Sequence, residues 1–229
     1  MDKFDAGRRS FLKLGSTAAV ASYIGSAKGQ ESGSHGAKDT VSLDARVMVS
    51  TPEHLANLVN PLQGTNSTQL FSRGNTLPIV AVPFAMAHWS MQSSDEASWF
   101  FQPQDNRLQG IRCTHQLSPW LQDYGYATFL PFQGDVSPEP SSRASSYRPE
   151  ELKIAPHYLK LCLMRYRCWV ELSPVEHGCF MQFTFQDGAP AGLYIDLPGE
   201  DSSAVYDSSS GILRFLTHKN EGGVQPNFA

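Results

Sequence analysis

Short apolar stretches separated by turn-forming residues make up most of this chain, and they determine its expected fold. Apolar, β-branched and aromatic residues recur over strand-length distances in several segments, namely residues 78–89, 110–114, 126–132, 158–164, 167–172, 178–185, 191–197 and 212–217. The connections 173–178, 186–188 and 207–211 are too short to hold a crossover helix, so the strands that they join should pair antiparallel. The pattern therefore predicts an all-β fold, an antiparallel β-sandwich.

The segments outside these strands carry other signals. Ser50 and Thr51 offer capping hydroxyls with Glu53 just behind them, and the Asn60-Pro61 pair stops a helix, so one short helix is expected between them. Residues 133–149 are rich in Pro and Ser, which predicts a long mobile surface loop.

The N-terminus has the composition of an export signal. Arg8-Arg9 precede a weakly apolar stretch at residues 14–24, and small residues at 25–27 offer a cleavage site. The apolar stretch is shorter than the roughly 20 residues that a membrane span needs. Residues 1–27 therefore read as a twin-arginine signal peptide, which predicts a periplasmic or secreted protein with no membrane span after signal removal.

The next residues divide into a leader and a domain. Residues 28–45 begin with a polar, Gly- and Ser-rich run and should form a flexible leader. Residues 46–229 should then form one β-sandwich domain, because about 200 residues are enough for a sizeable core.

Charge excludes one class of partner. The chain has 18 basic and 22 acidic residues, a formal net charge of -4, and no basic cluster outside the signal. Nucleic acid is therefore not an expected partner.

The four cysteines are Cys113, Cys162, Cys168 and Cys179, and their spacing is not that of a zinc site. Cys162 and Cys168 flank a possible hairpin turn, so they could face each other across a ladder and form a disulfide after export. Buried free thiols are the other interpretation. The sequence leaves both open.

Four motifs follow one another between residues 59 and 131, and they read VNPLQGT, VPFAMAHWS, CTHQLSPW and DYGYATFLP. They gather aromatic rings together with His, Asp and Gln side chains. Aromatic faces pack on the C–H surface of a sugar ring, and the polar side chains can bond to its hydroxyls. The mixture fits a carbohydrate site, although it also fits the core of a β-sandwich.

The order and spacing of these motifs resemble the N-terminal domain of glycoside hydrolase family 92, the calcium-dependent, exo-acting α-mannosidases. The resemblance covers about residues 58–197, including segments 171–173, 179–185 and 194–197. Three departures bear on linkage specificity: Ala85 stands where the family usually has Gly, and residues 66–76 and 117–120 differ from the family pattern.

The resemblance has several implications for fold and chemistry. It implies a galactose-mutarotase-like supersandwich, incomplete at its C-terminus, that would pack on a C-terminal catalytic helical barrel. In the family, that barrel supplies the catalytic acid, the base and the calcium ligands. No catalytic residue and no metal ligand are therefore expected within this chain, and the chain alone should be inactive.

The resemblance also points to a substrate contact. An aromatic residue soon after the Pro-Phe-x-Met motif reaches the sugar site in the family, and Trp89 matches it by position. Polar His88 and Ser90 flank Trp89, which favours a glycan contact over a place in the core. The candidate substrate-binding residues are Trp89, His115, Trp120 and Asp123.

Each of the other three candidates has a structural alternative. His115 can be a hydrogen-bonded structural histidine. Pro119 favours an exposed loop for Trp120, whereas Asp123 can belong to a plain turn.

These observations predict the N-terminal carbohydrate-binding portion of an exported glycoside hydrolase that acts on α-mannosides of glycans. One alternative is a stand-alone carbohydrate-binding module without catalysis. Another is part of a peptide N-glycan-releasing amidase, for which the pair Cys113 and His115 is the single hint of a Cys-His-Asp arrangement.

Overall fold

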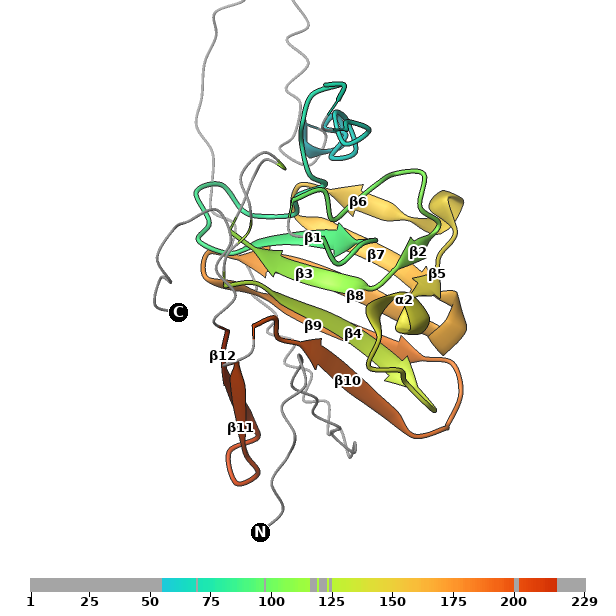
Figure 1. The fold of residues 1–229 in the computed structure, drawn as a ribbon, viewed down its shortest axis with the longest axis vertical. Helices are drawn as coiled ribbons and strands as arrows, with labels where there is room; N and C mark the ends of the chain where they lie inside the picture. Colours follow the sequence, from blue (N-terminus) through green and yellow to red (C-terminus); the bar gives the residue numbers. More distant parts are fainter. Residues whose placement is uncertain are drawn as a thin grey trace, which may run out of the picture.

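The computed structural model describes residues 55–68, 70–96, 98–115, 119, 123, 125–199 and 202–217. Two four-stranded antiparallel sheets stack on each other (Figure 1), which confirms the predicted all-β sandwich. The first sheet has the order β1-β3-β4-β10, with bounds His88–Gln92, Gly110–Thr114, Ala127–Gln133 and Ala191–Asp196. The second has the order β6-β7-β8-β9, with bounds Lys153–Ala155, Tyr158–Leu163, Cys168–Val175 and Gly178–Phe185.

Smaller elements lie around the two sheets. Two strand pairs are β2 with β5 and β11 with β12, whose bounds are Arg107–Leu108, Ser145–Ser146, Ser203–Asp207 and Ile212–Leu216. The short helices are α2 (Pro140–Arg143), η1 (Pro149–Glu151) and η2 (Met164–Tyr166). No helix among the described residues is long and apolar enough to cross a membrane.

The strand predicted at residues 78–89 was mostly wrong. Regular pairing begins only at His88, and the preceding residues form turns with one isolated bridge between Val80 and Trp89. Pro78 and Pro83 lack the N–H groups that a ladder needs, which explains the irregular path.

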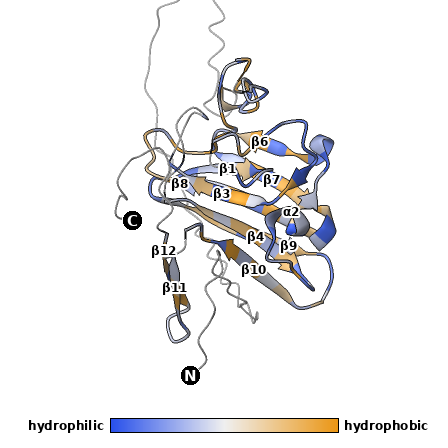
Figure 2. Cartoon of the chain, viewed as in Figure 1, coloured by the Kyte–Doolittle hydropathy of each residue, from blue (hydrophilic) through white to orange (hydrophobic). Residues whose placement is uncertain are grey.

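The second sheet shows how the apolar alternation builds the core. Along β7 and β8, Leu159, Leu161, Val170 and Leu172 are almost fully buried and belong to the main core cluster. The residues between them, such as Lys160 and Glu171, face the other side of the sheet. Figure 2 shows apolar residues along the strands of both sheets.

The loop predicted at residues 133–149 is more ordered than its composition indicated. It contains α2 and β5, and Arg143 at the end of α2 is fully buried. The Arg143 guanidinium pairs with Asp196 and lies 4.4 Å from the centre of the Tyr194 ring. A mobile loop was therefore the wrong prediction, because these contacts fix it to β10.

The cysteines are free thiols. In the β7–β8 ladder Cys162 is opposite Trp169, and Cys168 is opposite Leu163. Residues directly opposite one another share a face, so Cys162 and Cys168 point to opposite sides of the sheet. The disulfide alternative is excluded by this register.

The hairpin β11–β12 forms a sheet of its own below β10 (Figure 1). Ala204, Leu213 and Phe215 pack against a small cluster built on Ile195 and Leu197. The other face of the hairpin carries Val205, Ile212 and Leu216, which are exposed.

Several predictions lie outside the described residues. They are the signal peptide at residues 1–27, the leader at 28–45 and most of the short helix, of which residues 55 and 56 are described as helical. The start of the domain at residue 46 also falls there.

Candidate functional site

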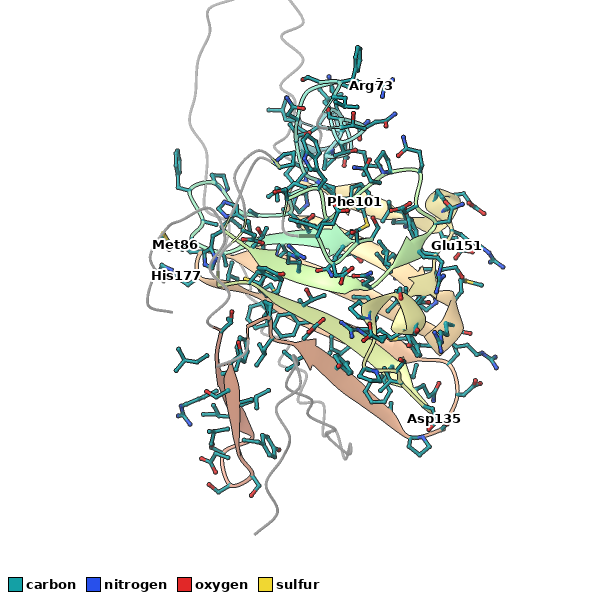
Figure 3. All side chains as sticks on the ribbon, viewed as in Figure 1. Arg73, Met86, Phe101, Asp135, Glu151 and His177 are labelled. Atoms are coloured by element: carbon teal, nitrogen blue, oxygen red, sulfur yellow. The ribbon has the colours of Figure 1, made fainter. Side chains whose placement is uncertain are left out.

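The Pro-Phe-x-Met motif forms an exposed turn at one end of the sandwich. Phe84 is 99% exposed and Met86 is 66% exposed. The backbone N–H of Met86 donates to the carbonyl oxygen of Glu176 at 2.8 Å, which fixes the turn to the β8–β9 connection. Figure 3 shows Met86 beside His177 at this end.

The backbone of Phe84 is strained. Its φ of 62° lies in the left-handed region, which bulky residues rarely adopt and which costs about 1–2 kcal/mol. The exposed ring gains nothing from burial that would offset this cost. Strain of this kind is concentrated at binding and catalytic sites, so the turn is the first candidate for a contact with a ligand or another domain.

Two histidines lie near the same end of the first sheet. His88 begins β1 opposite Thr114, and His115 follows Thr114 in the chain. Burial and the nearby His115 lower the pKa of His88, so its neutral form is favoured. Nδ1 of His88 is buried and has no hydrogen-bond partner among the described residues. A neutral imidazole in this position can donate to or accept from a ligand hydroxyl.

Gly125 (φ 56°) lies beside His115. A Cβ atom at Gly125 would lie 3.9 Å from Cε1 of His115. His115 is a candidate from the sequence, whereas His88 is not, although the polar residues on both sides of Trp89 were the available signal.

Asp123 is a structural anchor in this domain. Its carboxylate is fully buried, accepts from the Thr114 hydroxyl at 2.8 Å and from the His115 backbone N–H at 3.3 Å, and pairs with Arg112 at 3.4 Å. These bonds hold Asp123 against β3 and the residue that follows it. A direct contact of Asp123 with a substrate stays a prediction.

The partner of Asp123 was missed from the sequence. Arg112 lies with its guanidinium carbon 4.0 Å from the centre of the Phe100 ring and 3.8 Å from that of Tyr126. It donates to Gln92 at 2.8 Å through Nε, and to the backbone oxygen of Glu96 at 3.2 Å. Burial lowers the pKa of Arg112, and its neighbours Tyr126 and Asp123 oppose that shift.

The position of Arg112 in the strand could have shown from the sequence that its side chain is buried among partners. It lies between Ile111 and Cys113 in a short strand, and the alternation of side chains turns it to the opposite face. An arginine in that position needs buried partners.

Trp89 lies in the core, so the expectation that its side chain lies outside the core is wrong. It is only 6% exposed, belongs to the main core cluster and has its ring centre 5.8 Å from that of Phe129. Its indole N–H donates to the carbonyl oxygen of Gly178 at 3.2 Å, which joins the two sheets. The polar neighbours His88 and Ser90 are on the other face of β1.

The remaining candidates are not brought together as a set. His115 and Asp123 are adjacent through their hydrogen bond, whereas Trp120 lies outside the described residues. Contacts of His115 and Trp120 with substrate stay predictions.

The thiol of Cys113 is a poor nucleophile. Burial, with a smaller contribution from the negative charge of Asp123, raises the pKa of Cys113 to about 12. A cysteine nucleophile needs its thiolate form at working pH. A buried thiol that stays protonated does not favour the amidase alternative.

The described residues hold no cluster of ionisable side chains suited to a metal ion. No group of three or more His, Cys, Asp and Glu side chains in this part of the chain could hold a metal ion. No chemistry through a metal is assigned to these residues.

Comparison with known proteins shows to which family the chain is related, which the geometry alone does not show. The family pattern of the glycosyl hydrolase family 92 N-terminal domain matches residues 58–223. No curated protein sequence matches the chain.

Solved structures give the same relationship. An inverting mannosidase of family 92 from Bacteroides thetaiotaomicron is 32% identical, with a TM-score of 0.69, over 74% of this chain and 23% of its own. A family 92 α-mannosidase from the same organism is 24% identical, with a TM-score of 0.54, over 62% of this chain and 20% of its own, and supports the fold alone. This chain thus spans between a fifth and a quarter of the length of these two relatives. With most of its length matched by the family pattern, the chain belongs to glycoside hydrolase family 92, in the N-terminal domain of that family.

Proposed function

We propose that this chain is the carbohydrate-binding N-terminal portion of an exported enzyme that hydrolyses α-mannosides of glycans. The 32% identical relative described above is a mannosidase by name, which supports the reaction class. The chemistry itself is assigned to the helical catalytic domain with which this domain would pack. Calcium, which the resemblance implies for the complete enzyme, would be held there too.

The observation that carries the proposal is the strained, exposed turn at Phe84. An aromatic ring in water, held at a cost by a left-handed backbone, is suited to contact a sugar ring at the edge of the catalytic site. His88 at the start of β1 and His115 just after β3 lie at one end of the first sheet, and their imidazoles would supply hydrogen-bonding groups. The turn therefore replaces Trp89 as the proposed glycan contact of this domain.

In the complete enzyme, we expect Phe84→Ala to lower kcat/KM on α-linked mannobiose by about tenfold. The melting temperature should stay nearly unchanged because the side chain is 99% exposed. Steady-state kinetics and thermal unfolding on the same preparations provide the measurement.

Tyr206→Ala is the matched control, since Tyr206 is an exposed aromatic residue on β11, outside the turn. Equal kinetics for the two variants would count against a glycan contact at the turn. A stand-alone carbohydrate-binding module would bind glycan with no hydrolysis in any form of the protein, so the assay separates the two functions.

Export is proposed to use the twin-arginine route, on the basis of Arg8-Arg9 and the weakly apolar stretch behind them. Replacing both arginines with lysine should keep the protein in the cytoplasm. Cell fractionation followed by immunoblotting measures this, with Arg73→Lys as the matched control. Normal export of the double variant would refute the route.

A further inference from the structure

The outer face of the β6-β7-β8-β9 sheet carries aromatic and polar side chains in an ordered arrangement. Its inner face is apolar and belongs to the core, whereas Trp169, Glu171 and Phe180 on the outer face are not members of the main core cluster. Trp169 is half-buried there, and Phe180 is 74% exposed. The two aromatic rings offer flat apolar faces to a ligand on one strand-paired surface.

Strand register places these residues in successive rows across β8 and β9. Trp169 is opposite Thr184, Glu171 is opposite Gln182, and Ser173 is opposite Phe180. Partners of this kind share a face, so an aromatic side chain occupies each outer row and polar groups occupy the row between them. At about 3.3 Å per residue, the two aromatic rows are about 13 Å apart along the strands.

A shallow groove lies over the Trp169 end of this face. Its volume is about 430 Å³, and its lining residues are Glu151, Lys153, Lys160, Trp169, Glu171 and Thr184. The volume is in the range of small-ligand sites. Figure 3 shows Glu151 at the opposite end of the sandwich from Met86, so the groove is distinct from the Phe84 turn.

The polar groups of the groove are held in place by one another. The Lys160 ammonium is 2.9 Å from a carboxylate oxygen of Glu171 and 5.3 Å from the centre of the Trp169 ring. The hydroxyl of Tyr158 donates to the other oxygen of Glu171. Lys160 and Glu171 remain about one-third exposed, so they can exchange bonds with a ligand hydroxyl.

Charge selects the class of ligand. The lining contains two lysines and two glutamates, so positive and negative charges balance. A phosphorylated or acidic ligand would need an excess of positive charge, whereas a neutral polyol needs paired donors and acceptors beside an aromatic surface. The groove has the second composition.

We propose that this face, the Trp169–Phe180 face, binds a chain of neutral sugars, with Trp169 and Phe180 contacting two different sugar rings of one chain. This is a binding site beyond the Phe84 turn, and it takes no part in bond cleavage. It would hold the enzyme on a polymeric or branched substrate through contacts remote from the cleaved bond.

Affinity electrophoresis of the complete protein in gels that contain soluble mannan tests the proposal. Wild-type protein should be retarded, and Trp169→Ala should weaken the retardation by about tenfold in apparent dissociation constant. Phe180→Ala should weaken it by about threefold. Tyr206→Ala, which truncates an exposed aromatic residue on β11, should leave it unchanged. Hydrolysis of a short aryl mannoside should be the same in all four proteins.

A second measurement uses only the wild-type protein, so its result does not depend on whether the variants fold. Trp169 in the wild-type protein should be oxidised by N-bromosuccinimide, as read by peptide mass spectrometry, and α-linked mannotriose should slow its oxidation. Buried Trp89 is the internal reference. The proposal would be overturned if the wild-type protein were not retarded, or if Trp169→Ala and Phe180→Ala were retarded as strongly as the wild type. An unreactive Trp169 in the free protein would also overturn it, because another part of the protein would then cover the face.

Discussion

Replacing Arg112 with methionine should lower the free energy of unfolding by about 3–5 kcal/mol, because it leaves the carboxylate of Asp123 buried without its ionic partner. The stacking of the guanidinium between Phe100 and Tyr126 is lost as well. For a domain of this size the melting temperature should fall by at least about 6 °C. Urea unfolding followed by circular dichroism measures the change.

Two further variants show whether the orphaned charge is the cause. Asp123→Asn in the Arg112→Met background removes the unpaired charge and should recover part of the loss. Arg148→Met breaks the exposed ion pair with Glu151 and should leave the melting temperature nearly unchanged. A similar small effect for Arg112→Met would show that the buried pair does not stabilise the fold.

Trp89→Ala should cost about 3–5 kcal/mol, since it removes a large side chain from the centre of the core and leaves a cavity. The carbonyl oxygen of Gly178 also loses its donor. Trp89→Phe keeps most of the packing and should lose only part of this stability. Denaturant unfolding of both variants gives the two values.

Phe84→Ala makes the matched comparison, because it is another aromatic truncation, at a position that is 99% exposed. It should leave the denaturation midpoint unchanged. If Trp89→Ala had an equally small effect, the side chain could not be a core residue, and the glycan contact first expected for it would regain support.

The alternation of apolar and polar residues predicted the second sheet well, because β7, β8 and β9 each bury one face and expose the other. The prediction failed where partners are distant in sequence. Trp89 bonds to Gly178, a residue 89 positions away in the sequence. Its polar neighbours His88 and Ser90 lie on the opposite face of β1, so they say nothing about the surroundings of the Trp89 ring. Alternation alone does not say which face is covered by loops.

Buried arginines were the other source of error. Residues 133–149 have a loop-like composition, yet Arg143 fixes them through Asp196 on β10. Arg112 likewise depends on a carboxylate that follows the strand in an irregular segment. In both places the partner is set by tertiary structure, which local composition does not contain.

The hairpin β11–β12 makes the stability of this domain uneven. In the described part of the chain its strands pair only with each other, and one face packs on a cluster of a few apolar residues. Opening it breaks those contacts and leaves the two large sheets intact. The hairpin is therefore a separate cooperative unit that opens at a lower free energy than global unfolding, and its backbone amides exchange with solvent through an opening that the β7–β8 amides do not share.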